Sequence, residues 1–191
     1  MTKPSPWDVL KSSAVLDIRP WLSVFREEVR LPDGTVLDDF YRVQLRDFAV
    51  VAAFDEQDRW VLLREYKAGP RGFTLTPPAG LIEDGESPLV AARRELLEET
   101  GMASTEWFTI GKYVVDANRH CGTMHLFVAK NARRVQEALP ENGAMMPVQT
   151  VSDEEVVQAL VRQEFSVLPA AAAVGIVRTL RNANIPLSSA F

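Results

Sequence analysis

Three glutamates, Glu95, Glu98 and Glu99, lie within five residues of a segment whose pattern predicts a helix. Like charges three or four residues apart on a helix repel one another and lower its stability. Ser87-Pro88 is typical of a helix start and Gly101 of a helix end, so we expect the helix to cover about residues 88 to 100. A chain that keeps these acids together needs a group that offsets their repulsion.

A helical wheel, at about 100° per residue, indicates how the acids face the rest of the protein. The apolar stripe that we expect to pack on a sheet consists of Leu89, Val90, Ala92, Leu96 and Leu97. The three glutamates fall at the edge of this stripe, where partly buried carboxylates need a counter-charge. Arg94 supplies one positive charge, to Glu98 at i,i+4. A hard divalent cation is the natural candidate for the counter-charge that the three glutamates still need. From the helix alone, a solvated acidic face is the alternative interpretation.

The stretch before the helix favours the cation. "PPAGLIEDGE", residues 77–86, contains prolines and glycines that exclude a helix, so it enters the predicted helix as a loop. Its backbone carbonyls and the carboxylate of Glu86 can converge on the same cation as the helix glutamates. Glycines that serve only the turn are the alternative here.

The spacing of these residues resembles the Nudix box, G-x5-E-x7-R-E-U-x-E-E-x-G-U, where U is aliphatic. All nine constrained positions match, namely Gly80, Glu86, Arg94, Glu95, Leu96, Glu98, Glu99, Gly101 and Met102. The resemblance implies an α/β fold, the Nudix α/β/α sandwich with a mixed sheet, with N-terminal antiparallel strands added here. It also implies Mg²⁺-dependent hydrolysis of a nucleoside diphosphate linked to another moiety, with Mn²⁺ as a substitute cation.

The same resemblance implies roles for individual residues. Glu95 and Glu99 would be the main metal ligands and catalytic carboxylates, with Glu98 assisting and the backbone carbonyl of Ala79 completing the ligand set. The remaining box residues, Gly80, Glu86 and Arg94, would support the loop and the helix. A further carboxylate outside the box would activate water, and the candidates are Glu141 first and Glu137 second, each with a plain surface role as the alternative.

Within the family, "VLLREYKAG" and an N-terminal strand pair are similar to the ADP-ribose pyrophosphatase branch, which includes nucleoside diphosphate sugar hydrolases. That branch implies a homodimer built with the N-terminal strands. Lys67 stands where many members carry an arginine that binds the diphosphate, Trp21 or Trp7 would stack on a base, and Arg119 would contact a sugar or terminal phosphate. Surface or interface positions are the alternative for each. The region "VVDANRHCGTMH" stands in place of the Ser-Pro-Gly motif common in the branch, so GDP-mannose or a dinucleotide is the alternative substrate.

The rest of the chain predicts strands, a helix, strands and two more helices. Strands are expected from about residue 20 to 67, with "FAVVAAFD" buried on both faces, and later in "WFTIGKYVVD", "TMHLFVAK" and "PVQTV". Ser152 and Glu155 form a capping box for a helix to about 163, and an Ala-rich helix covers about 168–182. We expect residues 1–45 to form an N-terminal extension and 46–191 the hydrolase domain.

Composition narrows the partners. With a net charge of -5, the chain lacks the excess of positive charge with which proteins bind nucleic acid in bulk. The single cysteine excludes an intrachain disulfide and fits a reducing compartment, and no secretory signal or membrane-length apolar run is visible, so we expect a cytoplasmic protein. The rival from another class is a non-catalytic Nudix-fold sensor, although such modules usually lose box glutamates.

Overall fold

The computed structural model describes residues 6–139, 146–183 and 185 of the 191-residue chain. The strands, in chain order, are β1 (Asp8–Ile18), β2 (Leu22–Arg30), β3 (Val36–Gln44), β4 (Phe48–Asp55), β5 (Trp60–Lys67), β6 (Gly72–Thr76), β7 (Ala79–Leu81), β8 (Met102–Ala103), β9 (Glu106–Asp116), β10 (His120–Arg134) and β11 (Val148–Val151). The helices are α1 (Pro88–Thr100), α2 (Asp153–Val161) and α3 (Leu168–Asn182). The predicted order of strands, helix, strands and helices is confirmed.

The chain divides into two compact units, and the first comprises Met1–Asp47 and Val114–Thr123. In this unit β2 pairs antiparallel with both β1 and β3, and β3 pairs with the start of β10 through Val43 and His120. The sequence pattern predicts strands only from about residue 20, so β1 is an addition. Every residue of β1 is exposed, which explains why it carries no burial pattern.

The second unit comprises Phe48–Tyr113 and Met124–Phe191 and contains the helices. Its main strand order is β10-β4-β5-β11, while β6 pairs with β5, β7 with β4, and both β8 and β9 with β10. β4 runs parallel to β10 and antiparallel to β5, so the predicted mixed sheet is confirmed.

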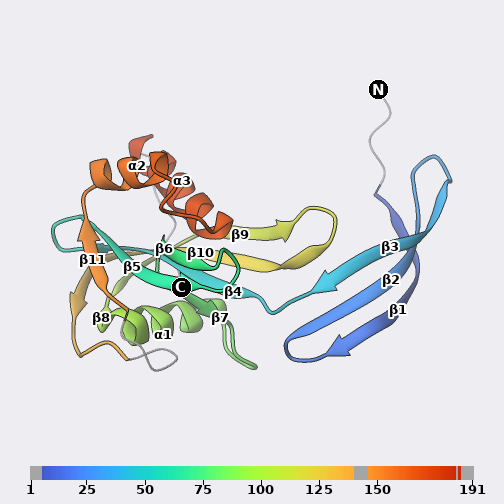
Figure 1. Cartoon of the computed structure of the whole chain (residues 1–191), viewed down its shortest axis with the longest axis horizontal. Coiled ribbons are helices and arrows are strands. Elements are labelled where there is room, and N and C mark those ends of the chain that lie inside the picture. Colours follow the sequence, from blue (N-terminus) through green and yellow to red (C-terminus); the bar gives the residue numbers. More distant parts are fainter. Residues whose placement is uncertain (1–5, 140–145, 184, 186–191) are drawn as a thin grey trace. The chain divides into compact units, whose positions relative to one another are not determined.

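Two hydrophobic cores cover the two faces of this sheet. Alternate residues of β4 explain the division, because successive side chains of a strand point to opposite faces. Ala49 and Val51 pack with Leu96 of α1, whereas Val50 and Ala52 pack with residues of α2 and α3. Figure 1 shows α1 on one side of the sheet and α2 and α3 on the other. The expectation that "FAVVAAFD", residues 48–55, forms a strand buried on both faces is correct, except that Phe48 is only partly buried.

Helix α1 begins and ends where its caps predict. The Ser87 hydroxyl accepts the Val90 N–H at 3.4 Å, and Gly101 adopts a left-handed conformation with φ 69°. The predicted packing stripe is wrong at Val90, which is 52% exposed, whereas Ala91 is fully buried. The helix is turned so that Ala91, Glu95 and Glu99, four residues apart along one side, share the buried face.

The two C-terminal helices also follow their sequence signals. Ser152 and Glu155 form the reciprocal capping box of α2, which ends at Val161, slightly before the predicted end at about 163. α3 has the predicted bounds. Within the described ranges, no helix is both long and apolar enough to cross a membrane.

Candidate active site

Glu99 lies at the point where α1 meets the loop that precedes it. Glu99 is only 6% exposed, and its Oε2 accepts a hydrogen bond of 2.9 Å from the backbone N–H of Ala79. Ala79 begins β7, and β7 is aligned by pairing with β4, in which Val50 lies opposite Ala79. The sheet therefore fixes the loop backbone against the helix carboxylate.

Glu95, one turn earlier, packs against the same loop. It is buried, and its carboxylate lies so close to Gly80 that a Cβ at that position would overlap its carboxyl atoms. The requirement for glycine at this position is thus steric. Glu95 and Glu99 form a pair of buried carboxylates on one face of α1, covered by residues 79 and 80.

Arg94 connects this pair to the loop. Its guanidinium makes two hydrogen bonds of 3.0 Å to the carboxylate of Glu86 and a third of 3.0 Å to the carbonyl of Leu81. Its Nη1 contacts Glu95 at 2.6 Å and Glu98 at 3.3 Å. The Glu86 carboxylate also accepts the Glu83 N–H at 3.0 Å. One arginine therefore fixes both the loop conformation and two of the helix glutamates.

Burial and neighbouring charge act in opposite directions on two of these acids. Loss of solvent raises the pKa of Glu99 well above its usual range, and the charges of Glu95 and Glu65 add to the rise. The Ala79 N–H and Lys67 oppose it. In contrast, the hydrogen bonds from Arg94 hold the pKa of Glu86 below its usual range. Burial and the neighbouring carboxylates thus disfavour the ionised form of Glu99, and a cation bound beside it would favour that form.

A further carboxylate of this cluster, Glu65, has no counterpart among the predicted site residues. Glu65 is 7% exposed, and its carboxylate accepts the Thr76 hydroxyl at 2.5 Å and pairs with the Lys67 ammonium at 2.8 Å. The sequence signal is an acid at the strand position that shares a face with Val61 and Leu63, both fully buried. Lys67, predicted as a diphosphate ligand, is therefore already tied to this cluster.

The donor chemistry fits a hard divalent cation. Carboxylate and carbonyl oxygens are the ligands that Mg²⁺ takes in proteins, and the Glu95–Glu99 pair and the Ala79 backbone supply them side by side. Across the described ranges no three acidic, imidazole or thiol groups form a ready-made metal cluster. Glu95 and Glu98 are instead held by Arg94, and Glu99 by the Ala79 N–H.

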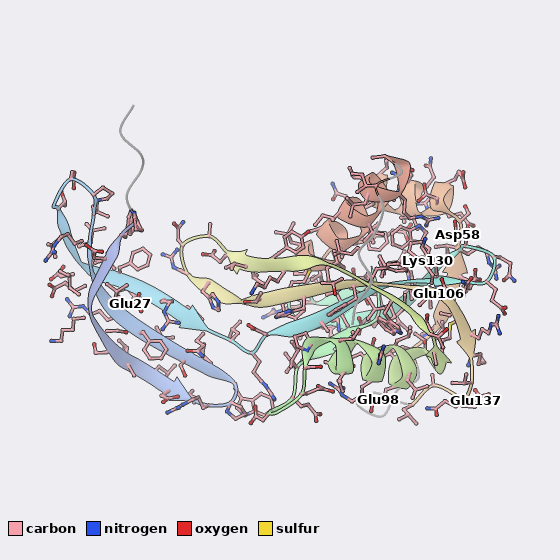
Figure 2. The ribbon with its side chains drawn as sticks, turned by 180° about the vertical axis from the view of Figure 1, so that it is seen from behind. Glu27, Asp58, Glu98, Glu106, Lys130 and Glu137 are labelled. Carbon is pink, nitrogen blue, oxygen red and sulfur yellow. The ribbon has the colours of Figure 1, made fainter. Side chains whose placement is uncertain are left out.

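The remaining glutamates differ in position. Glu98 is half exposed and lies on the side of α1 away from the sheet (Figure 2). The Glu98 carbonyl accepts the Leu139 N–H at 2.7 Å, so the segment after β10 is anchored on α1. Glu137 in this segment has a side chain 91% exposed, 3.8 Å from Arg134. Glu141, the first candidate for the base, lies outside the described residues.

Trp21 and Arg119 belong to the first unit, whereas Lys67 and the glutamates belong to the second. Trp21 is 68% exposed in the turn between β1 and β2. Arg119 is exposed at the turn between β9 and β10, where its backbone N–H donates to Asp116 and its carbonyl accepts the Val43 N–H. Both side chains are open to a ligand or to another chain.

Comparison with family models gives two adjoining matches. The model of the NUDIX domain matches residues 43–173, and that of the nucleoside diphosphate sugar hydrolase N-terminal domain matches residues 7–43. The first covers the whole cluster of carboxylates described above, and the second covers β1 to β3.

Three curated proteins show partial similarity. The methanol dehydrogenase activator of Bacillus methanolicus is 29% identical over 114 residues, 59% of this chain and 60% of that protein. The ADP compounds hydrolase NudE of Escherichia coli (strain K12) is 34% identical over 74 residues, 39% of this chain and 40% of that protein. The ADP-ribose pyrophosphatase of Bacillus subtilis (strain 168) is 26% identical over 116 residues, 61% of this chain and 62% of that protein. The chain thus matches less than two thirds of the length of each.

Among solved structures, the crystal structure of an ADP compounds hydrolase has a TM-score of 0.81 at 20% sequence identity, and the match covers 97% of this chain and 99% of that one. At this identity the likeness shows the fold. It agrees with the predicted Nudix α/β/α sandwich preceded by antiparallel strands.

Proposed function

The chain belongs to the Nudix family, and on that premise we propose that it is a Mg²⁺-dependent pyrophosphohydrolase of ADP-ribose or a related nucleoside diphosphate sugar. Water would attack one phosphorus of the diphosphate, and the bond from that phosphorus to the bridging oxygen would break as the new P–O bond forms. The bridging oxygen leaves with the other phosphate, giving a nucleoside monophosphate and a sugar phosphate. The observation that carries the proposal is the buried pair Glu95 and Glu99, packed against the backbone of Ala79 and Gly80. Such a pair is costly to keep ionised unless a cation joins it.

We assign the binding of the cation to Glu95, Glu99 and the Ala79 carbonyl, with Glu98 assisting. When bound, Mg²⁺ or Mn²⁺ neutralises charge on the phosphate oxygens as the bridge breaks. Arg94 holds the loop in position against the helix glutamates through its hydrogen bonds to the Glu86 carboxylate and the Leu81 carbonyl. Glu141 remains the proposed group that takes the proton of the attacking water.

The substrate class is supported by the first unit of the chain. Residues 7–43 match the N-terminal domain of nucleoside diphosphate sugar hydrolases, and two similar proteins carry names that specify ADP compounds and ADP-ribose. GDP-mannose or a dinucleotide is the alternative within the family. Retention of Glu95, Glu98 and Glu99 argues against a non-catalytic nucleotide sensor.

We further propose that residues 1–45 form a homodimer contact and residues 46–191 the hydrolase domain. Large apolar side chains are exposed on and beside β1, namely Trp7, Val9, Leu10, Val15, Leu16, Ile18 and Trp21. Apolar surface gathered in this way marks an interaction site. Sedimentation of a species near the 21.3 kDa monomer mass at micromolar concentration would contradict the dimer. The lone cysteine, Cys121, supports a reducing compartment, and we place the enzyme in the cytoplasm.

The experiment that tests the activity is a steady-state comparison of ADP-ribose, GDP-mannose, UDP-glucose and dATP with Mg²⁺, with Mn²⁺ and with a chelator. We expect ADP-ribose to give AMP and ribose 5-phosphate with the highest kcat/KM, and the chelator to abolish turnover. A higher kcat/KM for dATP than for the three diphosphates would overturn the substrate class and leave the Nudix chemistry standing. Nucleotide binding without hydrolysis of any compound would favour the sensor.

A further inference from the structure

The cation at the centre of the site, Arg94, has no hydrogen-bond donor left for a substrate. A guanidinium has five N–H groups. In the structure they make five bonds, two to Glu86 and one each to Leu81, Glu95 and Glu98. Beside the divalent cation, a positively charged hydrogen-bond donor for the substrate's diphosphate must therefore come from a residue other than Arg94.

Lys67 meets this need. Its ammonium has three donors, and in the described part of the chain one is directed to Glu65, at 2.8 Å. The side chain of Lys67 is 38% exposed, so the other donors can reach a ligand in solution. Lys67 also ends β5, and its charge acts on Glu99 across the site.

Glu65 is the group that determines where this ammonium lies. It is almost fully buried, and its carboxylate contacts the Lys67 ammonium on one side and the hydroxyl of Thr76, on the neighbouring strand β6, on the other. The backbone places this arrangement at the site, because Ala79, whose N–H holds Glu99, follows Thr76 by three residues. A buried carboxylate held on both sides is a rigid support for a flexible lysine.

We propose that Glu65 is a positioning residue that holds the Lys67 ammonium beside the carboxylates of α1 as the binding group for the substrate's diphosphate. The inference rests on the proposed function, since it assigns the origin of diphosphate affinity at that site. Without Glu65, the lysine would be drawn toward Glu99, on which its charge already acts, and would compete there with the divalent cation. Glu65 thus separates the two positive charges that the site uses.

The test compares Glu65→Gln, Lys67→Met and the double variant in saturating Mg²⁺. Glutamine keeps an acceptor for Thr76 and removes the charge that holds Lys67. We expect each single variant to raise KM for ADP-ribose at least about tenfold, the scale of one charge-assisted hydrogen bond, with kcat within about twofold. The double variant should be no worse than Lys67→Met, because Glu65 acts through Lys67. Lys67→Arg should recover part of the affinity.

A matched control is Glu164→Gln. Glu164 forms an ion pair of 3.0 Å with Arg64. Arg64 directly precedes Glu65 on β5, so the side chains of Arg64 and Glu65 point to opposite faces of the strand. This control should leave KM unchanged. Thr76→Val provides a second perturbation of Glu65 without a change of charge, and it should raise KM by a smaller factor. It also tests the proposal in case Glu65→Gln does not fold.

Calorimetric binding of adenosine 5′-(α,β-methylene)diphosphate, with Mg²⁺ and in chelator, separates this inference from the activity. If no compound is hydrolysed and yet Glu65→Gln and Lys67→Met weaken this binding equally and non-additively, the proposed function fails and the positioning role stands. Unchanged affinity and KM in both variants, additive losses, or a loss of kcat at constant KM would overturn the positioning role.

Discussion

Gly80 and the carboxylate of Glu95 occupy adjoining space, so that a side chain at Gly80 would overlap the carboxylate. The φ angle of Gly80 is not in the left-handed region, so backbone strain is not what requires a glycine. The conflict falls on the end of a flexible side chain. Its effect is therefore expected on the position of Glu95 more than on folding.

Gly80→Ala tests this separation of function from stability. We expect turnover to fall at least about tenfold, because displacement of Glu95 removes a positioned carboxylate from the cation site. The melting temperature without Mg²⁺ should change little. A calorimetric titration with Mn²⁺ measures cation affinity directly, and it should weaken in parallel with turnover. Gly85→Ala is a poor match because Gly85 has φ 82°. Gly69→Ala, at a site with open space and no positive φ, is the control.

Glu99→Gln should nearly abolish turnover and preserve the fold. The amide keeps the side-chain volume, removes a charged cation ligand and relieves repulsion from Glu95 and Glu65. We predict a rate loss of at least about a hundredfold, the scale of losing one preorganised charge-stabilising group. In chelator, the melting temperature should be equal to or higher than that of the wild type. Near-normal Mg²⁺-dependent activity would refute the assignment of Glu99 as a ligand.

The same residue gives stability a dependence on pH. Because burial raises the pKa of Glu99 above its ordinary value of 4.5, the folded state binds a proton that the unfolded state releases. The contribution of Glu99 to the free energy of unfolding is fully present below pH 4.5. It is lost as the pH rises through the pKa that Glu99 has in the folded state. In chelator, the free energy of unfolding of the wild type relative to Glu99→Gln should thus decrease as the pH rises above 4.5.

Urea unfolding of both proteins at several pH values measures this difference. Glu86, whose pKa is lowered, is present in both and cancels in the comparison. Added Mg²⁺ should reduce the slope, since a cation favours ionised Glu99. Parallel pH curves for the two proteins in chelator would show that Glu99 ionises in the folded state without cost.

Local sequence signals predicted helix α1 and its carboxylates well. Ser87 and Gly101 act through backbone groups next to them, so the bounds of α1 follow from the sequence. The side of α1 that packs on the sheet was less predictable. Ala91 and Val90 are both apolar neighbours, and only the contact with β4 decides that the smaller one is buried.

The sequence patterns do not predict features that depend on pairing between strands. β1 has no buried residue, and its apolar side chains do not alternate with polar ones as they do in a half-buried strand. Glu65 belongs to no motif, and its membership of the site follows from the pairing of β5 with β6, which brings Thr76 to it.

The general base offers the last prediction, because its two candidates, Glu141 and Glu137, are close in sequence and the structure describes only Glu137. The Glu137 side chain is 91% exposed and lies 3.8 Å from Arg134, an environment in which a carboxylate is solvated. Figure 2 shows it beyond the end of α1, apart from Glu98. We therefore expect Glu137→Gln to retain normal kcat.

Glu141→Gln should lower kcat by about a hundredfold or more with little change in Mg²⁺ affinity, as loss of a proton acceptor predicts. The pH profile of kcat distinguishes a base from a structural residue, since its acidic limb should disappear in Glu141→Gln alone. A normal profile in that variant, together with a loss in Glu137→Gln, would reverse the assignment.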